Sequence, residues 1–261
     1  MMGLSEAVIR ASRAFDSVAA RPWCVQPAMP ILFFGDVDAY RASPLRVLTV
    51  GLNPSRWEFP ADRPFSRFPI AERSSGGKRS RYLDAMSAYF STDPYKAWFS
   101  AYEPLLNGME ASYYYGSRAS TALHTDICSP VATNPTWNKL DAADRAELKN
   151  DGGPLWHMLL EELKPQIVTV SVAKVHLEDI AFTPLTSWRV IHTFRRKADG
   201  NRSAQPYQIH RRWYEVGGEE SLFIFGRAAR KPFGLLANIY KHEAGAMALD
   251  AYRGRSGLLV G

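Results

Sequence analysis

Two polar side chains follow apolar runs of the kind that form buried strands. Residues 45–51, LRVLTVG, are apolar and rich in β-branched side chains, and an Asn-Pro pair that begins at Asn53 stops the run. The run TALHTDIC, residues 121–128, carries Asp126 near its end. An Asn-Pro pair is also an ordinary turn signal, and an aspartate there can cap a loop or pair with an arginine. If both runs are parallel strands, the two side chains lie at the ligand-binding edge of a sheet.

Strand and helix patterns alternate along the chain, and these elements must position the two residues. This alternation predicts an α/β fold, a three-layer sandwich with a central, mainly parallel β-sheet flanked by helices. The length favours a single domain over residues 1–261, with an N-terminal helix and entry loop at 1–44, a core at 45–250 and a flexible tail at 251–261. Helical patterns occupy residues 4–19, 80–90, 94–106, 153–165 and 235–249, and further strand patterns occupy residues 166–172, 188–194, 207–216 and 221–226.

Arginine and lysine gather in three segments that follow predicted strands. The chain has a net charge of +6, which favours a polyanionic partner such as DNA. Because the segments follow strands of one sheet, we expect them to converge on one rim, although each alone also fits a solvated loop. The first segment lies in a long loop, residues 56–78, which we expect to lie against a ligand. The basic residues are Arg56, Arg63, Arg67, Arg73, Lys78, Arg79 and Arg81; Arg195, Arg196, Lys197, Arg202, Arg211 and Arg212; and Arg227, Arg230 and Lys231.

The composition argues against several other classes of protein. Two cysteines are too few for a four-cysteine metal cluster or a disulfide framework, and the histidines lack metal-binding helical spacing. No export signal and no run of roughly eighteen apolar residues is present, so we expect a cytoplasmic monomer without membrane, metal or cofactor. No G-x-G-x-x-G follows the first strand pattern, which disfavours a dinucleotide-binding domain. A Cys128 nucleophile beside His124 or His176 would make a thiol hydrolase, but the sequence offers no third, orienting residue.

Four segments resemble motifs of one enzyme family in the order that the family has them. VLTVGLNPSRW, residues 47–57, resembles the first motif of the uracil-DNA glycosylase superfamily, most closely the G-I-N-P-G form of its thymine and mismatch-specific branch. HTDICSP at 124–130 and LKPQIVTVSVAKV at 163–175 resemble the second and third strands. RKPFGLL at 230–236 resembles the second signature loop, written N-P-S-G-L-S in that branch. The resemblance covers residues 45–236.

The resemblance implies hydrolysis of the bond between a flipped-out base and its deoxyribose. It gives Asn53 the task of holding the attacking water through its amide oxygen, and it implies slow turnover because an amide is a weaker base than the Asp of other branches. Leu235 is the expected wedge into the base stack, with Phe233 or Leu236 as alternatives. The DNA-binding residues expected on this basis are Lys231, Pro232, Phe233, Gly234, Leu235, Arg227, Arg230 and Arg56.

Lys231 departs from the family pattern, which usually has His or Asn there. It can donate to the O2 oxygen of the leaving base or bind a flanking phosphate as a point charge, and the neighbouring arginines favour the phosphate.

The expected base follows from Asp126 and Ser55. A carboxylate only accepts hydrogen bonds, as the exocyclic amine of cytosine requires, whereas O4 of uracil would be repelled. Ser55 stands where uracil-only enzymes of the superfamily place a tyrosine against the C5 edge, which leaves room for a C5 substituent. Phe65 and Phe68 are the predicted stacking partners, and Leu52 is a further predicted base contact. Trp57, Trp137 and the tyrosine run at 113–115 are interpreted as packing.

These features together predict a monofunctional DNA glycosylase. Its substrate is expected to be a C5-modified cytosine, such as the glucosylated hydroxymethylcytosine of phage DNA, and its product an abasic site. No lysine lies beside Asn53 to form a Schiff base, so the DNA strand should remain intact. Two alternatives are a mismatch-repair glycosylase for uracil or thymine, and a non-catalytic module that binds modified DNA, which the departure at Lys231 favours.

Overall fold

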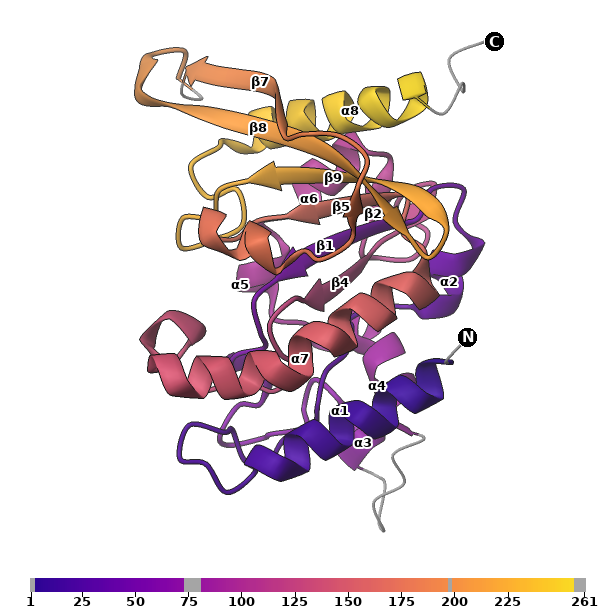
Figure 1. Cartoon of the computed structure of the whole chain (residues 1–261), viewed down its shortest axis with the longest axis vertical. Coiled ribbons are helices and arrows are strands. Elements are labelled where there is room, and N and C mark those ends of the chain that lie inside the picture. The colour runs from indigo at the N-terminus through magenta and orange to yellow at the C-terminus, as the bar shows by residue number, and fades with distance from the viewer. Residues whose placement is uncertain (1–2, 73–80, 197–198, 256–261) are drawn as a thin grey trace.

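A mixed β-sheet runs through the structure, a computed structural model that describes residues 3–72, 81–196 and 199–255 (Figure 1). Within these residues the sheet has seven strands in the order β4-β1-β5-β9-β8-β6, and β7 also pairs with β8. A separate pair is formed by β2 and β3. The strands are β1 (Val47–Gly51), β2 (Ala111–Ser112), β3 (Ser120–Thr121), β4 (Leu123–Asp126), β5 (Ile167–Val170), β6 (Thr183–Pro184), β7 (Arg189–Arg196), β8 (Arg202–Val216) and β9 (Glu219–Gly226).

The α/β class predicted from the sequence is confirmed, but the sheet is mixed rather than mainly parallel. β4, β1, β5 and β9 are parallel neighbours. β8 is antiparallel to β9, and β6 and β7 are antiparallel to β8. β8 and β9 form a hairpin through the Gly217–Gly218 turn, in which both glycines have positive φ.

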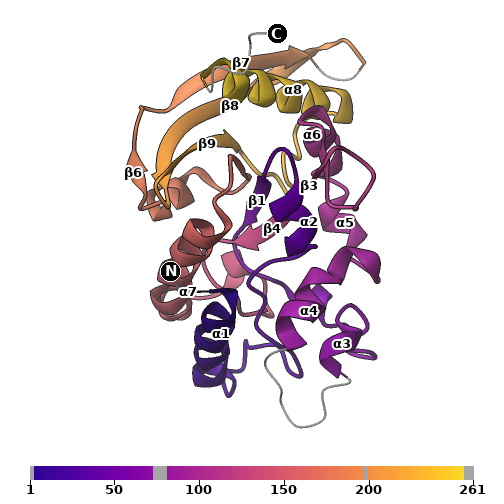
Figure 2. The same ribbon diagram turned by 90° about the vertical axis from the view of Figure 1, so that its right-hand side faces the viewer.

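The parallel strands form the centre of the core. All five residues of β1 and all four of β5 are buried, as expected for strands covered on both faces. In Figure 2, α7 and α1 lie on one side of these strands, and α5 and α6 lie on the other. The helices are α1 (Leu4–Val18), α2 (Val37–Ala42), α3 (Pro69–Glu72), α4 (Arg81–Ser87), α5 (Lys96–Phe99), α6 (Glu103–Gly108), α7 (Ala142–Leu163) and α8 (Asn238–Arg255).

The helix predicted at residues 94–106 is divided into α5 and α6, and two further helices differ from the sequence prediction at their ends. α7 begins eleven residues before the predicted start at 153, because Asp141 caps it by accepting a hydrogen bond from the Asp144 amide at 2.8 Å. Pro154 therefore lies inside α7 and does not start it. α8 continues to Arg255, so residues 251–255 are helical and not part of a tail; residues 256–261 lie outside the described part. Among the described helices, none has the length and apolar character to cross a membrane.

Candidate functional site

A cavity of about 460 Å³ opens at the edge of the sheet where the parallel strands end. Its wall is built by the segments that directly follow β1, β4, β5 and β9, as expected for a ligand site on a parallel sheet. The residues that line it are Phe34, Gly51, Leu52, Asn53, Pro54, Ser55, Trp57, Glu58, Tyr95, Trp98, Phe99, His124, Asp126, Thr136, Trp137, Asn138, Ser171, Val172, Ala173, Ala228 and Arg230. Asn53, Ser55, Leu52, Asp126 and Arg230 were predicted from the sequence, and the structure brings them together here.

The orientation of the Asn53 carboxamide is fixed by its surroundings. Its Nδ2 donates to the carbonyl oxygens of Pro54 at 2.9 Å and Val131 at 3.2 Å, and to Thr133 Oγ1 at 2.9 Å. Because carbonyl oxygens only accept hydrogen bonds, the amide nitrogen and not the oxygen must face them. The Oδ1 atom is thereby left as an acceptor, and within the described residues no donor occupies it.

Asp126 lies across the end of β1, in a position that depends on a glycine. Gly51 pairs with Asp126 in the sheet, and a Cβ at Gly51 would lie 2.4 Å from Asp126 Oδ1. The Asp126 side chain is 5% exposed, and its Oδ1 lies 3.7 Å from His124 Nε2. The other ring nitrogen, His124 Nδ1, lies 2.7 Å from Thr49 Oγ1, which also contacts the Tyr113 hydroxyl. Asp126 therefore neither caps a loop nor pairs with an arginine in the described structure.

Glu58 is a buried carboxyl in the cavity wall that the sequence analysis missed. It is 4% exposed, and the Tyr89 hydroxyl donates to its Oε2 at 2.5 Å while accepting from the Tyr95 amide at 2.8 Å. Burial raises the pKa of Glu58 from 4.5 to about 8, and the nearby Asp126 adds to the rise; the Tyr89 hydrogen bond and Arg67 oppose it. At neutral pH the side chain is a carboxylic acid, which is both a donor and an acceptor.

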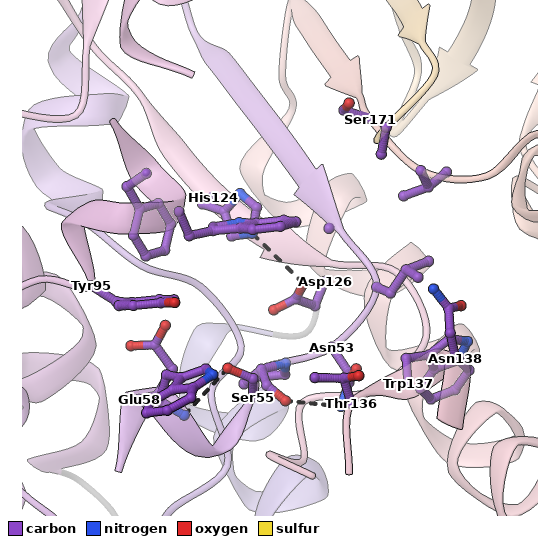
Figure 3. A pocket seen from close by; sticks show the side chains of 18 of the residues that line it. Asn53, Ser55, Glu58, Tyr95, His124, Asp126, Thr136, Trp137, Asn138 and Ser171 are labelled. Atoms are coloured by element: carbon purple, nitrogen blue, oxygen red, sulfur yellow. Dashed lines mark hydrogen bonds and ion pairs between the residues drawn. The ribbon is translucent and has the colours of Figure 1, made fainter. Parts of the chain in front are cut away.

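The labelled side chains of Glu58, Tyr95, Asp126 and Ser55 face a common space in Figure 3, and Asn53 lies beside Ser55. Aromatic rings form much of the surrounding wall: Trp57, Tyr95, Trp98, Phe99 and Trp137. The rings of Trp57 and Tyr95 are nearly parallel, with centroids 6.4 Å apart and an interplanar angle of 22°. The Arg56 guanidinium lies 4.3 Å from the Trp57 centroid, and Trp57 is 48% exposed. Trp57 and Trp137, interpreted from the sequence as packing residues, therefore belong to the cavity.

The predicted stacking residues lie elsewhere, and that prediction is wrong. Phe68 is fully buried between Phe59, at 5.4 Å between centroids, and Tyr89, at 5.3 Å. Phe65 packs edge-on against Phe59 at 6.0 Å and does not line the cavity. Both rings pack the loop after β1 against the core.

The loop between β9 and α8, residues 227–237, is anchored at several points. Phe233 is fully buried, its amide donates to Ser171 Oγ at 2.9 Å, and Ser171 Oγ donates to the Gly226 carbonyl at 3.0 Å. A Cβ at Gly226 would lie 2.1 Å from the Phe233 ring, so only glycine leaves room for that ring. Lys241, only 4% exposed, donates to the Pro232 carbonyl at 3.1 Å, and burial lowers the pKa of Lys241 to about 8.

The anchored loop presents a small set of side chains to solvent. Leu235 is 58% exposed although its neighbours Phe233 and Leu236 are buried. Gly234 permits this turn, because a Cβ there would lie 2.1 Å from the Ala229 carbonyl oxygen. Of the predicted DNA contacts, Arg227, Arg230, Lys231 and Arg56 are exposed. The side chains of Phe233 and Pro232 are buried, so the prediction that these two side chains contact DNA, and that Phe233 or Leu236 is an alternative wedge, is wrong.

Cys128 lies beside a histidine and a carboxylate, but the arrangement does not activate the thiol. Cys128 Sγ and Asp179 Oδ2 approach the same nitrogen, His176 Nδ1, at 3.9 Å and 3.0 Å. A relay through imidazole needs its two different nitrogens, and here a single one faces both groups. Burial also raises the pKa of the Cys128 thiol well above its ordinary value, which disfavours the nucleophilic thiolate.

The chain matches no protein-family model and no curated protein. The geometry of the cavity therefore carries the functional argument by itself.

Proposed function

We propose that this chain is a monofunctional DNA glycosylase, with a three-layer glycosylase-like α/β core, that hydrolyses the N-glycosidic bond of a C5-modified cytosine. The observation that carries the proposal is the Asn53 carboxamide, whose nitrogen is held by three acceptors and whose oxygen remains available in a cavity at the sheet edge. Such an oxygen can accept a hydrogen bond from one water and orient it toward a sugar carbon.

The attack itself needs little proton transfer at the outset. Breakage of the glycosidic bond proceeds through an oxocarbenium-like sugar, so a positioned neutral water suffices as the nucleophile. Asn53 fixes the water, the departing base carries away the bonding electron pair, and the proton that the water loses as it bonds to the sugar carbon passes to the base anion or to solvent. Donors that hold the base anion stabilise this charge, and they act more strongly in a cavity with apolar walls than in water.

Two carboxyl groups of opposite hydrogen-bonding character support recognition of cytosine. Asp126 offers acceptor oxygens for the exocyclic amine, and the protonated Glu58 offers a donor for an acceptor on the same base, N3 or O2. Uracil presents O4 and N3–H in the reversed order and would face repulsion from Asp126. The protonated Glu58 also provides one donor for the charge that develops on the leaving base.

The size of the cavity supports a substituted base. A volume of about 460 Å³ is in the range of sites for small organic ligands and exceeds the need of a bare pyrimidine. Ser55 has a small side chain, and its Oγ is directed to the Trp57 amide at 3.3 Å, so it does not fill the space. The wall formed by Trp57, Tyr95 and Trp98 can contact an apolar or sugar-like face of a C5 substituent.

The surface around the cavity fits flipping from DNA. The exposed Leu235 occupies an anchored loop beside the cavity-lining residues Ala228 and Arg230, which suits a wedge that fills the space left by a flipped base. Arg227, Arg230 and Lys231 can bind flanking phosphates. No lysine belongs to the described cavity wall, so we expect hydrolysis without a Schiff base and therefore without strand cleavage.

The proposal is tested with duplexes that carry single C5-substituted cytosines, unmodified cytosine, uracil or thymine. The freed base is identified by mass spectrometry, and the strand is examined for breaks before and after alkali. We expect release of a substituted cytosine, alkali-dependent breakage, and loss of release in Asn53→Ala with DNA binding retained. Asn150→Ala, which removes an exposed carboxamide of α7 outside the cavity wall, is the matched control and should retain base release. DNA binding by the wild-type chain without release of any base would refute the enzyme and support a binding module instead.

A further inference from the structure

The antiparallel pair β7 and β8 extends beyond the rest of the sheet on the side of the cavity. Gly226, the last residue of β9, pairs with Ile209 of β8, and β8 residues 202–208 continue past it with β7 as their partner. At about 3.3 Å per residue, seven further residues reach roughly 23 Å beyond the carboxyl end of β9. Figure 1 shows this pair, which we call the β7–β8 ribbon (residues 192–196 and 202–209), overhanging the end of β9.

One face of the ribbon is supported and the other is open. Phe194 and Tyr207 are paired, buried side chains, and the Phe194 ring lies 5.3 Å from the Tyr240 ring of α8. Because side chains alternate along a strand, the paired residues Thr193 and Gln208 point to the opposite face. The ribbon therefore rests on α8 and presents a polar face.

The distal part of the ribbon is positively charged. Arg195, Arg196 and Arg202 are exposed, and within the described residues no carboxylate lies at ion-pair distance from them. Arg196 and Arg202 are direct partners across the two strands, and the Arg196 guanidinium donates to the Gly200 carbonyl at 2.9 Å. Like charges in this position destabilise a strand pair, which makes a polyanionic ligand the natural compensation.

The ribbon is also joined to the loop that carries Leu235. The Tyr207 hydroxyl donates to the Arg227 carbonyl at 2.6 Å, at the point where β9 passes into the anchored loop. The spacing between the ribbon and the cavity is thus fixed by the sheet and by this hydrogen bond.

We propose that the β7–β8 ribbon binds duplex DNA in a groove on one side of the flipped nucleotide, with its arginines on phosphates. The proposal rests on the proposed function for the position of the flipped base. A major groove is about 12 Å wide and admits a two-stranded ribbon. With base pairs about 3.4 Å apart, the reach of the ribbon corresponds to roughly seven base pairs of flanking duplex.

The test compares Arg195→Gln/Arg202→Gln with a control of equal charge change, Arg10→Gln/Arg13→Gln, on α1 at the far end of the molecule from the ribbon (Figure 1). Binding to a 30-base-pair duplex with one central abasic-site analogue is measured by fluorescence anisotropy at several salt concentrations. Each lost phosphate contact lowers the slope of log K against log salt by about 0.9, so the ribbon variant should lose about 1.8 and the control nothing. Binding at low salt should weaken by roughly tenfold or more.

A second measurement locates the contact. Shortening the duplex to three base pairs on one side of the abasic site should weaken wild-type binding and leave the ribbon variant almost unaffected, whereas shortening the other side should affect both equally. Equal slopes for the two double variants, or no difference between the two sides, would overturn the inference. These assays need no base release, so they test DNA binding by the ribbon separately from the proposed function. Base release with no effect of the ribbon variant on binding refutes the role of the ribbon. An effect of the ribbon variant on binding without any base release refutes the glycosylase.

Discussion

Replacement of Glu58 by glutamine should change the pH dependence of protein stability, and the burial of this carboxyl sets both the direction and the size of the change. The pKa of Glu58 is raised from 4.5 to about 8, mainly because burial disfavours the charged form. Below pH 4.5 the group is protonated in both the folded and the unfolded chain and has no effect on the pH dependence of stability. As the pH rises from 4.5 to 8, the unfolded chain loses the proton while the folded chain keeps it, so the wild type loses free energy of unfolding.

The size of this loss follows from the pKa difference. A shift of 8 − 4.5 = 3.5 pKa units at 1.36 kcal/mol per unit corresponds to about 5 kcal/mol well above pH 8, and to about 3 kcal/mol at pH 7. The side-chain amide introduced by Glu58→Gln has no proton to lose in this range, and its oxygen can still accept from the Tyr89 hydroxyl. The variant should therefore gain stability over the wild type progressively between pH 5 and 8.5, by about 4 kcal/mol in total.

Urea unfolding followed by tryptophan fluorescence, at intervals between pH 5 and 8.5, measures this difference. Glu161→Gln is the control, because Glu161 is an exposed residue of α7 that does not line the cavity. Base release is a second readout. The rate of release by the wild type should fall as the pH rises through about 8, because Glu58 then loses its proton. The rate of release by Glu58→Gln should not fall over this range, because the amide keeps its donor. A stability difference that is constant with pH, or parallel pH profiles of release, would refute the protonated Glu58.

Three further outcomes are expected. Asp126→Asn should lower release of the substituted cytosine at least tenfold and gain binding of uracil-type bases, because the amide can donate to O4; unchanged release, measured by mass spectrometry of the free base, would contradict the recognition argument. Leu235→Ala should slow release from duplex DNA about tenfold and from single-stranded DNA much less, since only the duplex must be opened, and equal losses on both substrates would exclude a wedge role. Cys128→Ala should keep the wild-type rate of base release per folded molecule, and a complete loss would restore the thiol mechanism.

The parts of the site that sequence predicted are those encoded by local pattern. An apolar, β-branched run that stops at Asn53, and a second one that carries Asp126, identify two neighbouring buried strands, and the topology of parallel strands then brings their ends together. Leu235 was singled out differently, through the resemblance of residues 230–236 to a signature loop of the uracil-DNA glycosylase superfamily, and the structure shows its side chain to be exposed.

The parts that sequence missed depend on contacts between distant segments. Glu58 lies in a loop rich in arginine, where a carboxylate is expected to be solvated, and only packing against Tyr89 buries it. Phe68 has the sequence surroundings of an exposed ring, yet it lies under Tyr89 and Phe59. The antiparallel half of the sheet was underestimated because strand patterns do not specify direction.

The carbonyl groups around Asn53 also restrict which residue can serve at this position. An aspartate would have the same shape, but one of its oxygens would lie against the Pro54 and Val131 carbonyls, where only a donor is tolerated. Replacing Asn53 by aspartate, a stronger base, therefore requires the backbone at residues 54 and 131 to move as well. The choice of a carboxamide for the proposed water-positioning role is thus set by the main chain as much as by the side chain.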